Sequence, residues 1–180
     1  MNIFVLDYDL DKCAASMCDK HVVKMVLETA QLLSAAVRKI SPDNIPESAY
    51  KLTHASHPCT KWASESRANF NWLRELGLAI AREYTYRYGK IHKSSLVIEA
   101  MPILAGGDEM TKFAQAMPLQ FKKMDAVAAY RAYYIGDKLL SIQVTFSKRQ
   151  PPDWLLDKAS WKHDGNRWYI EAEKQSSGLS

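Results

Sequence analysis

The sequence lacks the cysteine pattern of a disulfide-stabilised protein and the long apolar runs of a membrane protein. Its 180 residues include three cysteines, and their odd count and loose spacing argue against a disulfide framework. No run approaches the roughly 18 apolar residues of a transmembrane helix, so no membrane contact is expected. The acidic start does not resemble a signal peptide, and reduced thiols are typical of the cytoplasm. We therefore expect a cytoplasmic protein.

The sequence also lacks a clear metal-binding pattern and a strong excess of one charge. Cys13 and Cys18 are too widely spaced for a CxxC clip, and His54 and His57 alone are too few for zinc, so no metal and no cofactor are expected. Lys and Arg number 24 against 20 Asp and Glu, a formal charge of +4. This balance permits DNA or a nucleotide as partner without requiring it, and it leaves the oligomeric state open.

Apolar residues recur with helical spacing through the middle of the sequence, which predicts several helices. The strongest helix prediction covers residues 19–40, which lack Gly and Pro and are rich in Val, Leu, Met and Ala. Ser41 and Pro42 end it, and residues 41–60, with three prolines, predict a long ordered loop. Further helices are expected over residues 60–88 with Gly89 as cap, over 94–101, and from 126 after an Asp125 cap.

The two ends of the chain are less regular. Asn2 to Leu6 predicts a short strand or an extended arm, and Asp11 is expected to cap a helix after it. Residues 142–146 predict a short strand, and Asp164-Gly165 predicts a hairpin turn. The sequence thus predicts a mainly α, compact, single-domain helical bundle over residues 1–174. It has a short N-terminal extended segment, an irregular C-terminal region and a disordered tail at 175–180.

A polar stripe crosses the first long predicted helix. His21, Lys24, Glu28 and Gln31 fall within an arc of about 80°, while apolar residues cover most of the remaining circumference. One interpretation is a Lys24–Glu28 pair on the single solvent-facing side of the helix. The other is one wall of an active site, with Glu28 as general acid or base. We favour the second because Gln31 continues the stripe.

Two further segments carry residues suited to phosphate and base contacts. Near the start of the second long helix, a site that attracts phosphate, are His54, His57, Lys61, Trp62 and Arg67. A capped helix start, with His57 bonding the backbone, is the alternative that needs no ligand. The next segment alternates cations with tyrosines, which suits nucleic acid and equally suits a half-buried helix end. Its candidates, with one from a similar later run, are Arg87, Lys90, His92, Lys93 and Arg131.

The segment from Cys18 to Lys39 resembles the phage pyrimidine-dimer DNA glycosylases of the endonuclease V type. In that family an Asp-x-His pair precedes a catalytic Glu on a long helix, and a basic stretch follows. The matching residues, by type and spacing, are Asp19, His21, Glu28, Arg38 and Lys39. A weaker similarity extends from His57-Pro58 through the next helix, and the chain as a whole resembles small phage-encoded proteins.

The resemblance implies a compact helical enzyme that acts on DNA without a metal. Its N-terminal amine attacks C1′ of a damaged nucleotide to form a Schiff base, and the glutamate assists base departure and strand cleavage. In general an α-amine has a pKa of about 8 and is partly neutral at pH 7. In the family the amine belongs to a small residue exposed after Met1 is removed. Residue 2 is Asn2 in this chain, so the amine is expected to be that of Met1.

Three functions follow from these observations. The first is a DNA glycosylase, with or without AP-lyase activity, acting on a damaged or modified pyrimidine base. The second is another nucleotide- or base-modifying enzyme of phage DNA metabolism, and the third is a non-catalytic phage protein that binds nucleic acid or protein. The catalytic candidates are Glu28, His21, Met1 and Asn2. The binding candidates are Asp19, Lys24, Gln31, His54, His57, Lys61, Trp62, Arg67, Arg87, Lys90, His92, Lys93 and Arg131.

Overall fold

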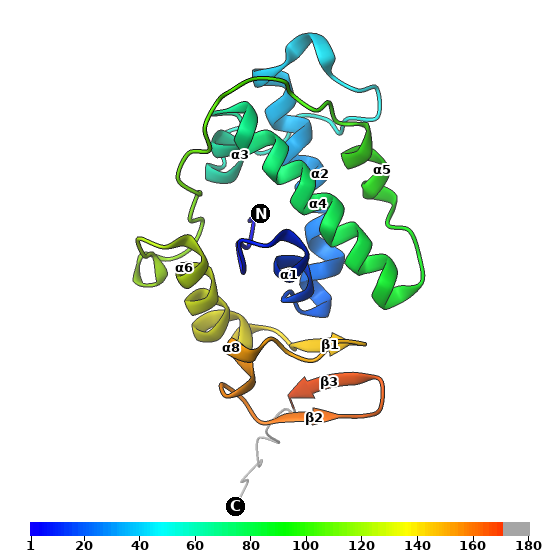
Figure 1. Ribbon diagram of the computed structural model, residues 1–180, viewed down its shortest axis with the longest axis vertical. Helices are drawn as coiled ribbons and strands as arrows, with labels where there is room; N and C mark the ends of the chain where they lie inside the picture. The colour runs from blue at the N-terminus through cyan, green and yellow to red at the C-terminus, as the bar shows by residue number, and fades with distance from the viewer. Residues whose placement is uncertain (171–180) are drawn as a thin grey trace, which may run out of the picture.

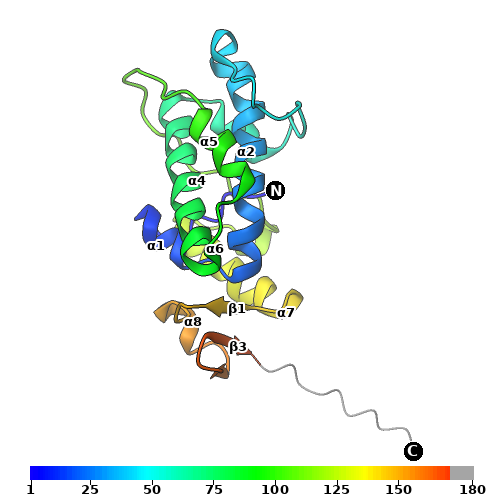
Figure 2. The ribbon, with the colours of Figure 1, turned by 90° about the vertical axis from the view of Figure 1, so that its right-hand side faces the viewer.

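Helices form most of the computed structural model, which describes residues 1–170 (Figure 1). The mainly α, compact fold predicted from the sequence is confirmed. The two longest helices, α2 (Asp19–Ile40) and α4 (Arg67–Tyr88), pack against each other. Around them lie α1 (Leu10–Ala15), α3 (Pro58–Ala63) and α5 (Lys93–Ala100), as Figures 1 and 2 show. None of the helices in the described part of the chain is long and apolar enough to span a bilayer.

The rest of the described chain adds short helices and a small antiparallel sheet at one end of the molecule (Figure 1). The helical elements are α6 (Ala126–Tyr133), a π-helical turn (Tyr134–Lys138), α7 (Leu139–Ser141) and α8 (Asp153–Leu156). The sheet order is β1 (Thr145–Ser147), β3 (Arg167–Ile170) and β2 (Trp161–His163). The hairpin predicted at Asp164-Gly165 is confirmed, whereas β1 begins later than the strand expected over 142–146. The tail expected at 175–180 lies outside the described residues.

The contact between α2 and α4 depends on a glycine. A Cβ at Gly77 would lie 2.6 Å from the Thr29 methyl of α2 and 3.0 Å from Ile98 Cδ1 of α5. The absence of a side chain therefore lets three helices approach at one point. The boundaries of α2 are those the sequence predicts, because Ser41 and Pro42 end the helix there.

The second long helix predicted over residues 60–88 is interrupted. Ser64 ends α3, and the Ser66 hydroxyl accepts a hydrogen bond from the Asn69 N–H at 3.1 Å and so caps α4. Serine favours such caps over helix interiors because its hydroxyl competes for backbone groups. The cap of α1 also differs from the prediction, since Asp9, not Asp11, accepts from the Lys12 N–H at 2.9 Å.

The first six residues form an extended arm and not a strand. Ile3 to Leu6 are buried, and the start of the chain lies beside α2 (Figures 1 and 2). Phe4 adopts a φ of 34° and stacks on His21 with ring centroids 4.5 Å apart. A positive φ is costly for a bulky residue, so tertiary packing holds the arm in this conformation.

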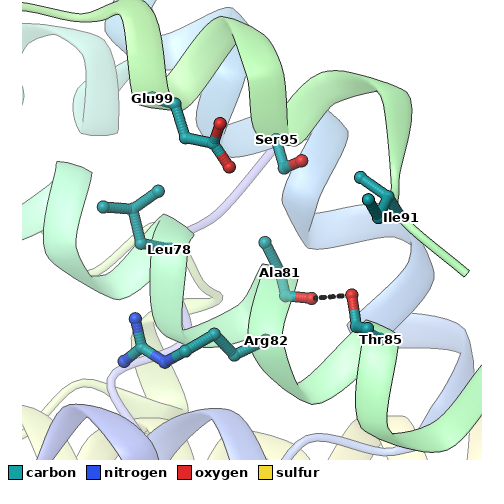
Figure 3. A pocket seen from close by; sticks show the side chains of 7 residues that line it. All are labelled: Leu78, Ala81, Arg82, Thr85, Ile91, Ser95 and Glu99. Carbon is teal, nitrogen blue, oxygen red and sulfur yellow. Dashed lines mark hydrogen bonds between the residues drawn. The ribbon is translucent and has the colours of Figure 1, made fainter. Parts of the chain in front are cut away.

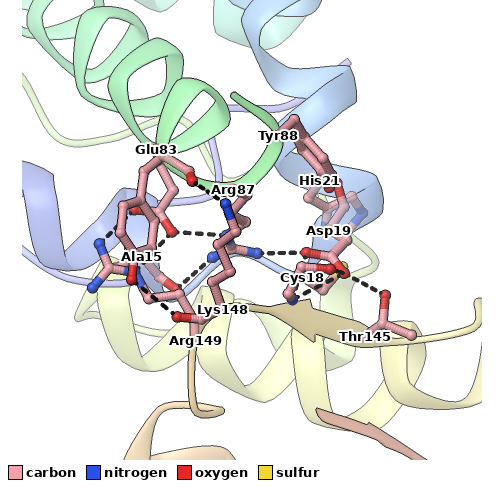
Figure 4. Close-up of polar contacts among 12 residues, drawn as sticks. Ala15, Cys18, Asp19, His21, Glu83, Arg87, Tyr88, Thr145, Lys148 and Arg149 are labelled. Carbon is pink, nitrogen blue, oxygen red and sulfur yellow. Dashed lines mark hydrogen bonds and ion pairs between the residues drawn. The ribbon is translucent and has the colours of Figure 1, made fainter. Parts of the chain in front are cut away.

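A buried ion network sits at the centre of Figure 4. The Arg87 guanidinium, on α4, donates to Glu83 at 2.7 Å, to Asp19 at 3.0 Å and to the Ala15 carbonyl at 3.0 Å. Arg149 donates to Glu83 at 2.8 Å. Burial alone would raise the pKa of Glu83, but the hydrogen bonds and charges of Arg149 and Arg87 outweigh it and lower that pKa. The charges in this network compensate one another.

The same network attaches the small sheet to the helices. Asp19, at the start of α2, accepts hydrogen bonds from the Thr145 hydroxyl at 2.7 Å and the Ser147 N–H at 3.0 Å, both on β1. The buried Arg87 guanidinium donates to the same carboxylate, so Asp19 links β1 to α4.

We predict that Arg87→Ala costs about 3–5 kcal/mol of unfolding free energy, because it removes the buried cation that pairs with both Glu83 and Asp19. Arg82→Ala on the same helix is the matched control. Its ion pair with Asp11 is 61% and 76% exposed and should contribute under about 1 kcal/mol. Urea denaturation followed by circular dichroism measures both values. Equal, small losses would contradict a supporting role for the buried network.

Candidate active site

The carboxylate of Glu28 lies almost completely out of solvent beside the start of the chain. The residue is 6% exposed, and its Oε1 is 3.1 Å from Lys24 Nζ and 3.8 Å from the Met1 amine. Its Oε2 accepts a hydrogen bond from the Asn2 backbone N–H at 3.1 Å. A buried carboxylate is tolerated when it is paired and hydrogen-bonded, and three nitrogens meet that need here.

The two interpretations of the polar stripe are each present in part. The Lys24–Glu28 pair forms, and the Lys24 side chain is 64% exposed. Glu28 does not lie on the solvent-facing side, because its side chain is 8% exposed. The exposed edge of α2 carries Val23 and Leu27 as well, so this helix is less completely surrounded by core than its apolar composition suggested. Gln31 is half-buried.

The Asn2 side chain holds the arm against a distant part of the chain. Its Nδ2 donates to the Ala116 carbonyl at 3.0 Å, and its Oδ1 accepts from the Tyr130 hydroxyl at 2.7 Å. That hydroxyl also lies 2.7 Å from the Ala114 carbonyl. The residue next to the terminal amine is therefore fixed by α6 and by the segment that precedes it.

His21 supports the arm from the other side. Its ring stacks on Phe4, and its Nδ1 hydrogen-bonds the buried Tyr134 hydroxyl. Burial, and then the charges of Lys138 and Lys24, lower the pKa of His21 to about 3. The ring is therefore neutral at pH 7, where it positions its neighbours and cannot serve as a proton donor of the usual histidine kind.

The loop-to-helix junction reaches the edge of this site. His57 Nδ1 accepts a hydrogen bond from the Cys59 N–H at 3.2 Å and caps α3. This is the backbone-bonded cap that the sequence offered as the alternative to a phosphate site. Burial and then the charge of the terminal amine lower the pKa of His57, so the ring lies close to the start of the chain. His54, Lys61 and Arg67 are exposed.

Three of the predicted binding residues are placed where they serve the core. Trp62 is 2% exposed and packs edge-on against Trp72. Arg87 is 3% exposed, and Asp19 is committed to it and to β1. In the structure the aromatic ring of Trp62 fills the core, and the charges of Arg87 and Asp19 pair with each other.

The remaining predicted residues lie away from Glu28. Lys90 and Lys93 are exposed after the end of α4, where His92 caps α5 by accepting from the Ser94 N–H at 3.1 Å. Arg131 donates to the Leu6 carbonyl at 2.8 Å at the base of the arm. The structure thus gathers four of the predicted residues, Met1, Asn2, Lys24 and Glu28, with His21 and His57 at their edges.

Sequence reasoning missed three aromatic residues that position the arm: Phe4, Tyr130 and Tyr134. Tyr130 and Tyr134 are spaced i, i+4 after the Asp125 cap, so they share one face of the predicted helix. That spacing is a usable signal for a pair of buried hydroxyls. The partners of those hydroxyls, Asn2 and His21, are more than a hundred residues away and have no local signature.

Glu28 lines none of the four pockets described on the surface. One of about 370 Å³ lies between α4 and α5, and its polar lining residues are Arg82, Thr85, Ser95 and Glu99 (Figure 3). Among residues 1–170, no group of three His, Cys, Asp or Glu side chains is arranged to hold a metal ion. The exposed neighbour of the Glu28 carboxylate is Lys24, whose side chain is mostly in solvent.

The arrangement defines a mainly helical protein with a carboxylate and an α-amine paired at the chain start. The family model described as pyrimidine dimer DNA glycosylase matches residues 1–96, more than half of the 180 residues. The chain therefore belongs to the pyrimidine dimer DNA glycosylase family. DNA is the class of substrate that this membership implies. No curated protein and no solved structure matches the chain.

The low pKa of His21 predicts a loss of stability in acid. Folded His21 has a pKa of about 3, whereas an unfolded histidine titrates near pH 6.5, so the unfolded state takes up the proton first. The contribution is intact above about pH 6.5 and is lost as the pH falls towards 3.

When the pH is lowered from 7 to 5, protonation of His21 in the unfolded state should lower the free energy of unfolding by about 2 kcal/mol. Urea denaturation at both pH values measures the difference, with His21→Gln as the comparison because its amide can still bond Tyr134. We expect a flatter pH dependence for this variant. The same slope in both proteins would show that His21 does not titrate as described.

Proposed function

We propose that the chain is a DNA glycosylase that releases a damaged or modified pyrimidine base, with its α-amine as nucleophile and Glu28 as the acid–base partner. The observation that carries this proposal is the buried Glu28 carboxylate, 3.8 Å from the Met1 amine. An amine must be neutral to attack, and a carboxylate beside it can take up the proton it loses.

The proposed reaction follows from these two groups. The lone pair of the amine attacks C1′ of the nucleotide, the C1′–N bond breaks, and its electron pair leaves with the base, which takes up a proton. Loss of a proton from the nitrogen and opening of the sugar then give a Schiff base at C1′. In a lyase step, removal of a proton at C2′ by Glu28 would expel the 3′ phosphate.

Lys24 is the cation that a substrate meets first at this site. Its Nζ bonds Glu28 while most of its side chain remains in solvent. A phosphate of the reacting nucleotide can draw this ammonium away from the carboxylate, which frees Oε1 for proton transfer. Exposed Lys61 and Arg67 add positive charge beyond His57, on the side of the site where α3 and α4 begin.

Two nitrogens are candidates for the nucleophile. The Met1 amine is the terminal nitrogen of the chain as it stands. If Met1 is removed, the Asn2 nitrogen becomes the α-amine, and it lies 3.1 Å from Glu28 Oε2. Because Glu28 has one oxygen next to each nitrogen, the same carboxylate serves either form. The intact mass of the purified protein states which form exists.

We predict that Glu28→Gln lowers the rate of base release at least about 100-fold, because the amide cannot accept a proton. Binding to the same duplex should change less than about threefold, since the carboxylate supports chemistry and not affinity. Ultraviolet-treated and modified-base duplexes, scored for released base and for strand breaks, provide the measurement.

The matched control is Glu75→Gln, which removes an exposed carboxylate that pairs with Arg74 on the surface of α4. This variant should release base at the wild-type rate. If Glu28→Gln is equally active, the proposed acid–base role is wrong. If it loses DNA binding together with base release, Glu28 acts in holding the arm and not in the chemistry.

A further inference from the structure

A groove on the surface is lined mostly by residues 112–126, which lie beyond the part of the chain that the family model matches. Its volume is about 510 Å³, and it lies between the end of the N-terminal arm and the segments on either side of the 3₁₀ helix Leu119–Phe121. Three of its lining residues are lysines, two are aromatic and one is methionine. They are Lys112, Lys122, Lys123, Tyr8, Phe113 and Met124.

Exposed apolar side chains accompany the lysines. Met124 is 97% exposed and Leu119 is 81% exposed. A single exposed apolar residue needs no explanation, because much of any protein surface is apolar. Here Leu119 and Met124 follow closely on residues 114–116, which hydrogen-bond to the core. Lys122 and Lys123 precede Met124 in the chain and are also exposed.

The segment that carries these side chains is held in place on two sides. The Gln115 side chain donates to the Lys123 carbonyl at 2.7 Å and accepts from the Lys123 N–H at 3.0 Å. The Phe121 ring packs on Tyr133 and fills the space that Gly136 leaves, since a Cβ there would lie 2.6 Å from the ring. The residues just before Met124 are therefore tied to the rest of the fold by side-chain contacts.

The same support is attached to the candidate active site. Ala116, next to Gln115, accepts the hydrogen bond from the Asn2 side chain, and Ala114 lies against the Tyr130 hydroxyl. Two hydrogen bonds therefore connect Asn2 to the groove. One joins Asn2 to Ala116, and the other joins Gln115 to Lys123.

We propose that the groove binds the DNA strand next to the reacting nucleotide, with Met124 as an apolar wedge between two bases. The inference rests on the proposed function. Lys112, Lys122 and Lys123 supply the positive charge that phosphates require. Apolar side chains such as Met and Leu that enter a base step unstack it and bend the duplex. An unstacked duplex exposes C1′ of the reacting nucleotide to the amine.

The test uses the full chain carrying Glu28→Gln, so that binding is measured without chemistry. The probe is a lesion-containing duplex with 2-aminopurine beside the lesion, whose fluorescence rises when its base is unstacked. Adding Met124→Ala should remove most of that rise and weaken binding about fivefold, roughly the loss of one stacking contact. Leu140→Ala, another exposed apolar residue at 84%, is the matched control and should change neither.

The lysines are tested by the salt dependence of binding. Combining Lys122→Ala with Lys123→Ala should lower the slope of log K against log salt concentration by about 1.8, because each phosphate contact contributes about 0.9. Lys158→Ala, outside the groove, should leave the slope unchanged. The proposal is overturned if Met124→Ala behaves as Leu140→Ala does, or if the lysine pair behaves as Lys158→Ala does. Unstacking without any base release by the unsubstituted protein would refute the proposed function and leave the groove standing.

Discussion

The structure depends on one interaction, the pairing of the buried Glu28 carboxylate with the terminal amine of the chain. A carboxylate as buried as that of Glu28 needs polar partners, and the terminal amine, Lys24 and the Asn2 N–H supply them. Each partner is itself a constraint. The amine can reach the carboxylate only because six residues of extended chain run through the core to deliver it.

Side chains that are distant in sequence hold the N-terminal arm in this position. Tyr130 and the Ala116 carbonyl fix Asn2, while His21 stacks on Phe4 of the arm. The positive φ of Phe4 means that the arm would not adopt this path without its neighbours. The family match ends at residue 96, so part of what holds the amine in place comes from the unmatched half of the chain. Burial of a neutral His21 adds rigidity at the cost of stability in acid.

The parts of the fold that were predictable from sequence are those specified locally. The α2 helix, its end at Ser41-Pro42, the Gly89 cap and the Asp125 cap follow from periodicity and capping chemistry. The break at Ser64–Ser66 was missed because apolar residues continue with helical spacing on both sides of it, and two serine hydroxyls decide the outcome. For the site, the stripe identified Lys24 and Glu28, but burial of Arg87 and Trp62 depends on packing that no local pattern encodes.

The central claim is that the α-amine, held against Glu28, forms the covalent bond to DNA. Borohydride reduction during reaction with a damaged duplex converts a Schiff base into a stable protein–DNA adduct, and proteolysis followed by mass spectrometry locates it. The account predicts an adduct on the α-nitrogen of the N-terminal peptide. An adduct on the side chain of Lys24 or Lys61, or base release with no adduct at all, would contradict it.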